Sequence, residues 1–302
     1  MTPSGIGRST RAVAELVTES LAIVTERTRP VINACYGGRQ SSSMRFRHSI
    51  SYEKTAMDEA MDTFLLLQVR NADDPMRNQE IDCFARALGC ASSQIEVFDL
   101  LAGVPTVQQL AQFDVVLLGG SGDYSVAEGG AWLAPILEAM RELYALSKPT
   151  FASCWGFQAF AKAMGGDVIT DMDRAELGTL EVYLSEEGKH DPVFSPLGEC
   201  FVAPMGHQDH VVRLPPGAVR LAYSDKTENQ AFCFPGKPVY CTQFHPELNA
   251  AALLQRVQAY PKYVNTITGE TLEEFKLRCR ETPATDQLLG HFMKHALGEN
   301  RE

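Results

Sequence analysis

Residues 151–166 read FASCWGFQAFAKAMGG: a short apolar run meets a cysteine and passes at once into a helix-like pattern of alanine and large apolar residues. This change of pattern predicts a strand, a sharp turn at Cys154 and a helix. On such a turn a thiol is exposed and faces the N–H groups of the first helical turn, which suits a nucleophile. Taken alone, a cysteine at this junction is more often a packing residue, because free cysteine is among the most buried residue types.

Strand and helix patterns alternate in the segments before this junction. Residues 63–69 (TFLLLQV), 95–100 (IEVFDL) and 114–120 (DVVLLGG) read as buried strands. Residues 76–88 read as an amphipathic helix that Gly89 stops. Strands that alternate with helices predict an α/β fold with a doubly wound, mostly parallel sheet.

The chain of 302 residues is expected to have three parts, because the regular alternation of strand and helix patterns begins only at Met61. Before it, residues 37–54 (GGRQSSSMRFRHSISYEK) are polar, rich in serine and arginine, and show no sustained period. We therefore expect residues 1–60 to be an N-terminal extension with a flexible segment. Residues 61–254 are expected to form the main domain, and residues 255–302 a structural helical flank.

Capping signals support the helices of that flank. Asn249 can cap a helix over residues 250–260, and Thr271 with Glu274 forms a Thr-x-x-Glu capping box. Residues 286–297 (DQLLGHFMKHAL) carry an apolar stripe. Two or three helices are therefore expected to pack against the main domain.

Composition narrows the classes of function. The formal net charge is −11, and no run of lysine or arginine forms a stripe that could follow a phosphate backbone, so no nucleic-acid partner is expected. No apolar segment approaches the roughly 20 residues that span a bilayer, so no membrane association is expected. Eight cysteines without a CxxC pair, and an N-terminus without a signal-peptide pattern, predict a cytoplasmic location.

Two histidines in GHQDH, His207 and His210, are candidate metal ligands because they lie three residues apart. No third ligand stands at a recognised spacing, so we expect no metal site. No cofactor is expected either.

Four segments carry polar groups at places where predicted strands end. They are residues 117–125, 151–158, 205–211 and 239–248. Ligands of doubly wound folds bind outside the carboxyl ends of the strands, so we expect these segments to meet at one site.

The last of these segments, VYCTQFHPEL, carries an imidazole and a carboxylate. Residues 239–244 read as a strand, and Pro246 favours an extended conformation of His245. Residues two apart in an extended chain point the same way, so the side chains of His245 and Glu247 can meet. A carboxylate beside an imidazole fixes its tautomer and stabilises its protonated form. Together with Cys154, they would make a set of nucleophile, base and orienting group.

Motifs in this order resemble those of the class I glutamine amidotransferases, the family that includes the glutaminase parts of GMP synthetase and carbamoyl phosphate synthetase. CWGFQ at 154–158 resembles the nucleophile turn, and QFHPE at 243–247 resembles the His-Pro-Glu signature. GGSGD at 119–123 resembles the glycine-rich oxyanion strand, and GHQDHVVRLP at 206–215 the segment that closes over the substrate. The resemblance covers residues 61–254 and implies the family's flavodoxin-like fold, with extra C-terminal helices.

The resemblance implies hydrolysis of the side-chain amide of L-glutamine. Cys154 would attack the amide to give a γ-glutamyl thioester. His245 would protonate the departing ammonia and then activate water, while Glu247 stays charged. A cysteine at a helix N-terminus and near an imidazolium is well suited to the attacking step, because both favour a thiolate.

Other residues would bind the oxyanion and the rest of the substrate. The resemblance assigns the oxyanion to the N–H of Trp155 and a glycine N–H near Gly120, and one such donor is typically worth about 3–4 kcal/mol. The implied contacts with the α-amino and α-carboxylate groups of glutamine are Gln158, Gly122 and the backbone around Gln208 and Asp209. The sequence departs from the family at Ser121, where proline is common, and at Gln208, where GMP synthetases usually have glycine.

The residues after 254 are too few for an ammonia-consuming synthase domain of the usual ~100–150 residues, so the acceptor of the ammonia is not identified. Three functions therefore stay open. The favoured one is a glutaminase that delivers ammonia to a partner enzyme on another chain or to a small acceptor. The second is a γ-glutamyl peptidase, because stand-alone relatives with a similar AYSDKT and HPE arrangement cleave other γ-glutamyl amides. The third is an inactive binding or regulatory module, against which the intact Cys154, His245 and Glu247 argue.

Overall fold

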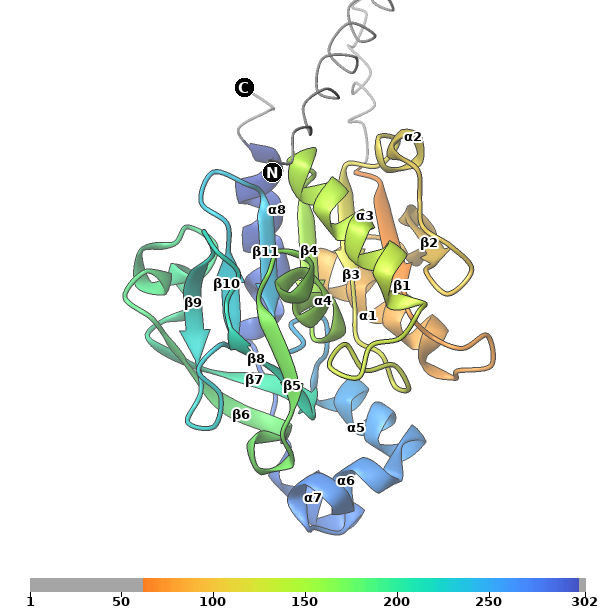
Figure 1. The fold of residues 1–302 in the computed structure, drawn as a ribbon. Helices are drawn as coiled ribbons and strands as arrows, with labels where there is room; N and C mark the ends of the chain where they lie inside the picture. The colour runs from red at the N-terminus through yellow and green to blue at the C-terminus, as the bar shows by residue number, and fades with distance from the viewer. Residues whose placement is uncertain (1–61, 299–302) are drawn as a thin grey trace, which may run out of the picture. The chain divides into compact units, whose positions relative to one another are not determined.

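A computed structural model of the chain describes residues 62–298. The extension expected at residues 1–60 lies outside this part, and its boundary stays a prediction. The main sheet of the described part has nine strands in the order β2-β1-β3-β4-β11-β10-β9-β6-β7, and a second sheet pairs β5 with β8 (Figure 1). The strands are β1 Phe64–Gln68, β2 Ile95–Asp99, β3 Val115–Leu118, β4 Thr150–Ser153, β5 Asp167–Thr170, β6 Glu176–Leu184, β7 Cys200–His207, β8 Asp209–Arg213, β9 Val219–Tyr223, β10 Ala231–Cys233 and β11 Val239–Thr242.

The half of the main sheet that runs from β2 to β11 is parallel. In it, β1 pairs with β2 and β3, and β4 pairs with β3 and β11. Beyond β11, the strands β10, β9, β6 and β7 join in antiparallel pairs. The predicted α/β fold with a mostly parallel central sheet is confirmed, and the antiparallel edge extends it.

Helices cover both faces of the sheet. The α-helices are α1 Met76–Leu88, α2 Val107–Leu110, α3 Leu133–Ala145, α4 Trp155–Ala163, α5 Ala250–Ala259, α6 Pro261–Thr268, α7 Leu272–Arg278 and α8 Leu288–Gly298. Short 3₁₀ helices lie at Ser92–Gln94, Met172–Arg174, Gly188–His190, Ser195–Leu197 and Thr285–Gln287. α1 packs against α8, and α3 packs against α4. None of the helices in residues 62–298 is both long and apolar enough to cross a membrane.

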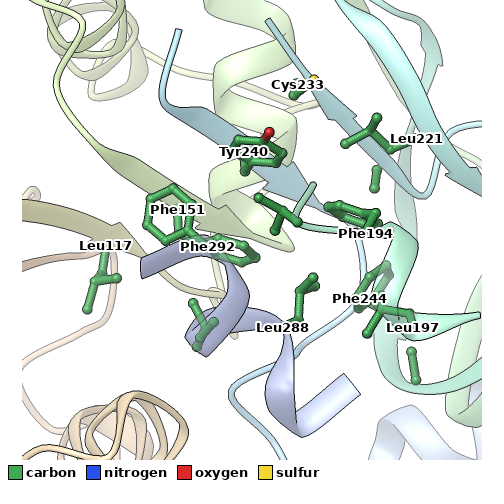
Figure 2. Close-up of a cluster of buried hydrophobic side chains, with 14 of the residues drawn as sticks. Leu117, Phe151, Phe194, Leu197, Leu221, Cys233, Tyr240, Phe244, Leu288 and Phe292 are labelled. Carbon is green, nitrogen blue, oxygen red and sulfur yellow. The ribbon is translucent and has the colours of Figure 1, made fainter. Parts of the chain in front are cut away.

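The core has two main layers because successive strand residues face opposite sides of the sheet. Leu117 of β3 and Phe151 of β4 belong to the layer under α1 and α8, where Phe151 contacts Phe292 with ring centroids 5.3 Å apart. Figure 2 shows these side chains together with Phe244, which follows β11. Leu118, the next residue of β3, belongs to the opposite layer with α3 and α4. This packing fixes the carboxyl ends of β3, β4 and β11 beside one another.

Three sequence signals set the ends of helices as expected. α1 ends at Leu88 and is capped by Gly89, whose left-handed conformation (φ 70°) lets its N–H bond to the carbonyl oxygens of the last turn. The side chain of Asn249 caps α5 by accepting from the N–H of Ala252 at 2.9 Å. Thr271 and Glu274 form the predicted capping box at α7. Figure 1 shows α5, α6 and α7 gathered at one end of the sheet.

Several predicted boundaries differ from the structure by one or two residues, and the C-terminal part forms four α-helices, α5 to α8, where two or three were expected. One boundary matters for the site. The strand expected over 239–244 ends at Thr242, where its pairing with β10 stops at Ala231. The hydroxyl of Thr242 then donates to the main-chain oxygen of Phe244 at 2.8 Å, which bends the chain out of the sheet. The His-Pro-Glu segment therefore begins in a loop at the carboxyl end of the sheet.

Candidate active site

Cys154 occupies the turn between β4 and α4. Its backbone has φ 51° and ψ −102°, a conformation that non-glycine residues rarely adopt and that costs of order 1–3 kcal/mol. The surrounding main chain holds it, because the Cys154 N–H donates to the Thr242 oxygen at 2.7 Å and the Gly156 N–H to the Gly119 oxygen at 3.2 Å. A Cβ on Gly156 would lie 2.6 Å from the Cβ of Leu118, so glycine allows the helix to approach the strand. The predicted strand, turn and helix are all present.

The imidazole of His245 and the carboxylate of Glu247 meet beside this turn. Nδ1 of His245 lies 2.6 Å from Oε1 of Glu247, and both side chains are buried. Burial alone would lower the pKa of His245, but the charges of Glu247 and then Cys154 raise it to about 9. Burial would likewise raise the pKa of Glu247, but the charges of His245 and Arg256 hold it at about 2. The pair therefore favours a protonated imidazole and an ionised carboxylate at neutral pH.

One cavity of about 260 Å³ connects most of the residues that the sequence singled out. Those that line it are Cys154, His245, Gly120, Gly122, Trp155, Gln158, Gln208 and Asp209. Glu247 lies behind His245 and is fully buried. The volume is just below the 300–1,000 Å³ of pockets for drug-sized ligands, which suits a small substrate.

The side chains expected near the α-amino and α-carboxylate groups are already bonded within the protein. Nε2 of Gln158 donates to the main-chain oxygen of Asp209 at 2.9 Å and to Oε1 of Gln243 at 3.2 Å. The carboxylate of Asp209 accepts from the hydroxyls of Ser125 and Thr170, both at 2.6 Å. Asp209 therefore fastens the loop after β3 to β5, and its side chain braces this wall of the cavity.

The N–H of Gly120 has a partner that the sequence did not indicate. It donates to Oε1 of Glu80, on α1, at 3.2 Å. Glu80 is fully buried, and Arg70 binds its carboxylate through Nη2 at 3.0 Å and Nε at 3.1 Å. A Cβ on Gly119 would lie 2.3 Å from that carboxylate, so α1 packs directly against the glycine loop.

Three further residues at the cavity come from the segment that was assigned to a structural flank. Tyr260 and Tyr263 line the cavity, and the hydroxyl of Tyr263 donates to the main-chain oxygen of Gly122 at 3.0 Å. Arg256 of α5 also lines it, with Nη1 3.4 Å from Nδ1 of His245. No motif marks these positions, although the cap at Asn249 indicates that a helix begins directly after the His-Pro-Glu segment.

The two histidines of GHQDH lie in different surroundings. His207 contacts Glu176 through Nε2 at 3.1 Å and the main-chain oxygen of Asp209 through Nδ1 at 3.0 Å. His210 is buried, both of its ring nitrogens have no hydrogen-bond partner, and burial lowers its pKa. Across residues 62–298, no three His, Cys, Asp or Glu side chains converge in a way that could hold a metal ion.

Comparison with known proteins identifies relatives of this chain. The sequence profile of the family described as "Glutamine amidotransferase class-I" matches residues 79–254. The chain is 32% identical over 201 residues to a glutamine-hydrolyzing GMP synthase of Aspergillus fumigatus, which covers 62% of this chain and 35% of that protein. It is 33% identical over 143 residues to one of the subunits of a glutamine-hydrolyzing GMP synthase of Sulfolobus acidocaldarius, with 47% of this chain and 72% of the relative covered. The alignments span 39%, 35% and 30% of the first three curated relatives, so the chain matches about a third of their length.

Solved structures show the same fold at low sequence identity. A glutamine amidotransferase from Thermotoga maritima superposes with a TM-score of 0.60 at 20% identity and covers 78% of this chain and 99% of that one. A glutamine amidotransferase from Methylobacillus flagellatus superposes with a TM-score of 0.56 at 17% identity and covers 78% and 95%. The chain therefore shares its overall fold with these solved structures.

Proposed function

Because this chain belongs to the class I glutamine amidotransferase family, we propose that it hydrolyses the side-chain amide of L-glutamine with Cys154 as nucleophile. One observation carries the proposal: a thiol on a strained strand–helix turn shares a small cavity with an imidazole that a buried carboxylate orients. This is the geometry of a nucleophile, a general base and an orienting group.

The proposed reaction runs in two steps. The thiolate of Cys154 attacks the amide carbon, and the carbonyl electrons move onto the oxygen. Protonated His245 gives its proton to the leaving nitrogen, so that ammonia departs and the γ-glutamyl thioester remains. His245 then takes a proton from water, the water oxygen attacks the thioester, and glutamate leaves as the thiolate re-forms. Glu247 keeps its charge throughout and stabilises the imidazolium.

The developing oxyanion needs hydrogen-bond donors in place before the reaction. We assign this role first to the N–H of Trp155, which opens α4 directly after the nucleophile. The N–H of Gly120 donates to Glu80, so it can serve the oxyanion only if that bond is exchanged. Gly120 is therefore the second donor in this proposal, and Trp155 the first.

We further propose that the ammonia passes to a synthase on another chain. The similarity to the Sulfolobus acidocaldarius protein supports this, since that relative is named as one of the subunits of a glutamine-hydrolyzing GMP synthase.

Ammonia release by the purified full chain tests the proposal. Cys154→Ala should lower glutamine turnover by at least about 10³-fold, as expected for a lost nucleophile. The variant should still fold, with a single cooperative melting transition, because alanine can adopt the same backbone conformation. Cys200→Ala is the matched control, since that thiol is exposed, and it should keep full activity. Retained activity in Cys154→Ala would overturn the assignment, and high turnover on γ-glutamyl dipeptides with negligible turnover on glutamine would favour a peptidase.

A further inference from the structure

The end of α5 and the start of α6 place two aromatic side chains at the active-site cavity. Tyr260 and Tyr263 both line it, and their rings meet edge to face with centroids 6.2 Å apart. We call this pair of side chains the tyrosine wall. The match to the family profile ends at residue 254, so the tyrosine wall belongs to a part of the chain that the profile does not cover.

The glycine loop after β3 holds both rings of the tyrosine wall. The hydroxyl of Tyr263 donates to the main-chain oxygen of Gly122 at 3.0 Å. The ring of Tyr260 lies against the same glycine, because a Cβ added to Gly122 would be 3.0 Å from Cζ of Tyr260. The hydroxyl of Tyr260 donates to Oδ1 of Asp74 at 2.7 Å. A tyrosine has only two side-chain torsions, so these contacts are enough to fix each ring.

Tyr263 is close to the proposed nucleophile on one side and to an apolar cluster on the other. Burial raises the pKa of Tyr263, and the charge of Cys154 raises it further, so the hydroxyl keeps its hydrogen and its bond to Gly122 at neutral pH. Tyr263 also packs against the apolar cluster between β6 and the C-terminal helices, which includes Leu177 and Val264. This packing hinders the ring from moving away from the cavity.

The fixed rings limit the space that a substrate can use. The amide carbon must lie against Sγ of Cys154 for attack, so the groups attached to it must fit within the same cavity. Its volume of about 260 Å³ is below the roughly 300–1,000 Å³ of pockets for drug-sized ligands. A packed wall rejects a larger ligand by steric overlap, which is a source of specificity. L-Glutamine carries only hydrogens on its amide nitrogen, whereas a γ-glutamyl peptide carries a further residue there.

We propose that the tyrosine wall sets an upper limit on substrate size, so that the site takes the unsubstituted γ-amide of glutamine and rejects γ-glutamyl peptides. The proposal rests on the proposed function, because it concerns the same cavity and the same nucleophile. Tyr260 and Tyr263 are specificity-determining residues that act through the size of their rings. The bond from the hydroxyl of Tyr263 to Gly122 only holds its ring in position.

Ligand binding to Cys154→Ala tests this proposal without turnover. Isothermal titration calorimetry gives the Kd of L-glutamine and the Kd of γ-glutamylalanine. Glutamine should bind at least about 10-fold more tightly, because overlap with a packed wall is costly. Adding Tyr263→Ala should lower the ratio of the two Kd values by about 10-fold. Adding Tyr263→Leu shortens the side chain but keeps its apolar packing, so it should lower the ratio too, and it provides the test if the alanine variant does not fold.

Two further variants separate ring size from other effects. Tyr263→Phe loses the bond to Gly122 but keeps the ring, so the ratio of the two Kd values should stay near that of Cys154→Ala. Leu277→Ala is the control on α7, because that side chain is 90% exposed and does not line the cavity. It should leave the ratio unchanged.

Several outcomes would overturn the size limit. One is a dipeptide that binds to Cys154→Ala as tightly as glutamine does, and another is a ratio that both Tyr263→Ala and Tyr263→Leu leave unchanged. An equal fall of the ratio in Tyr263→Phe and Tyr263→Ala would assign the effect to the bond with Gly122 instead of the ring. Failure of the proposed function looks different, because glutamine would then bind to none of these variants, or Cys154→Ala would still release ammonia.

Discussion

Replacing Glu247 by glutamine removes the negative charge beside His245 while keeping the size of the side chain. The carboxylate accepts a hydrogen bond of 2.6 Å from Nδ1 of His245. Burial alone would lower the pKa of His245, and Glu247 is the largest of the contributions that raise it to about 9. The ordinary value is about 6.5, and one pKa unit corresponds to about 1.4 kcal/mol, so the shift represents about 3 kcal/mol of folding free energy.

The pH range of this effect follows from the two pKa values. The protonated His245 binds its proton more tightly in the folded state, so its stabilisation is complete below about pH 6.5 and is lost as the pH rises through 9. Glu247 has a lowered pKa of about 2, so its own contribution is present above about pH 4.5 and stays constant between pH 6 and pH 10. Because Cys154 also contributes to the shift, the stability advantage of the unchanged protein over Glu247→Gln should shrink by up to about 3 kcal/mol between pH 6 and pH 10.

Urea unfolding at pH 6 and pH 10 measures this difference. The same pair of proteins in a Cys154→Ala background removes the contribution of the thiolate and shows how much Glu247 supplies. Turnover of Glu247→Gln should fall less than that of Cys154→Ala, because an orienting carboxylate contributes less than the nucleophile. A stability difference that is equal at the two pH values within about 0.5 kcal/mol would refute the view that Glu247 keeps His245 protonated.

Two other predictions concern stability. Glu80→Ala leaves buried Arg70 without its main partner and should lower the free energy of unfolding in urea by about 3–5 kcal/mol. Glu273→Ala, at an exposed ion pair, is the control and should change that free energy by less than about 0.5 kcal/mol. Similar effects of the two substitutions would contradict the role of Glu80. A chain that begins at Met61 should keep its melting temperature and glutamine turnover. Insolubility of that shortened chain would show that the N-terminal segment is part of the domain.

Local sequence was sufficient to predict those features of this protein that depend on residues close together in the chain. The alternation of apolar runs and amphipathic segments predicted the α/β fold, because each element buries the face that its own period creates. The turn at Cys154 was predictable, since a strand pattern changes to a helix pattern at one residue. His245 and Glu247 were predictable as a pair because they lie two residues apart in an extended segment.

Tertiary structure alone decided the contacts between residues that are distant in the chain. The antiparallel order of β10, β9, β6 and β7 is one example, because a period-2 pattern says which face is buried but not which strand is the neighbour. The bond from Gly120 to Glu80 joins residues 40 positions apart, and the bond from Tyr263 to Gly122 joins residues 141 positions apart. The contact of Arg256 with His245 likewise depends on where α5 lies at the end of the sheet. The sequence thus determined which side chains we propose as the reactive groups, whereas the charges and hydroxyls around them depend on how helices cross, which no local period encodes.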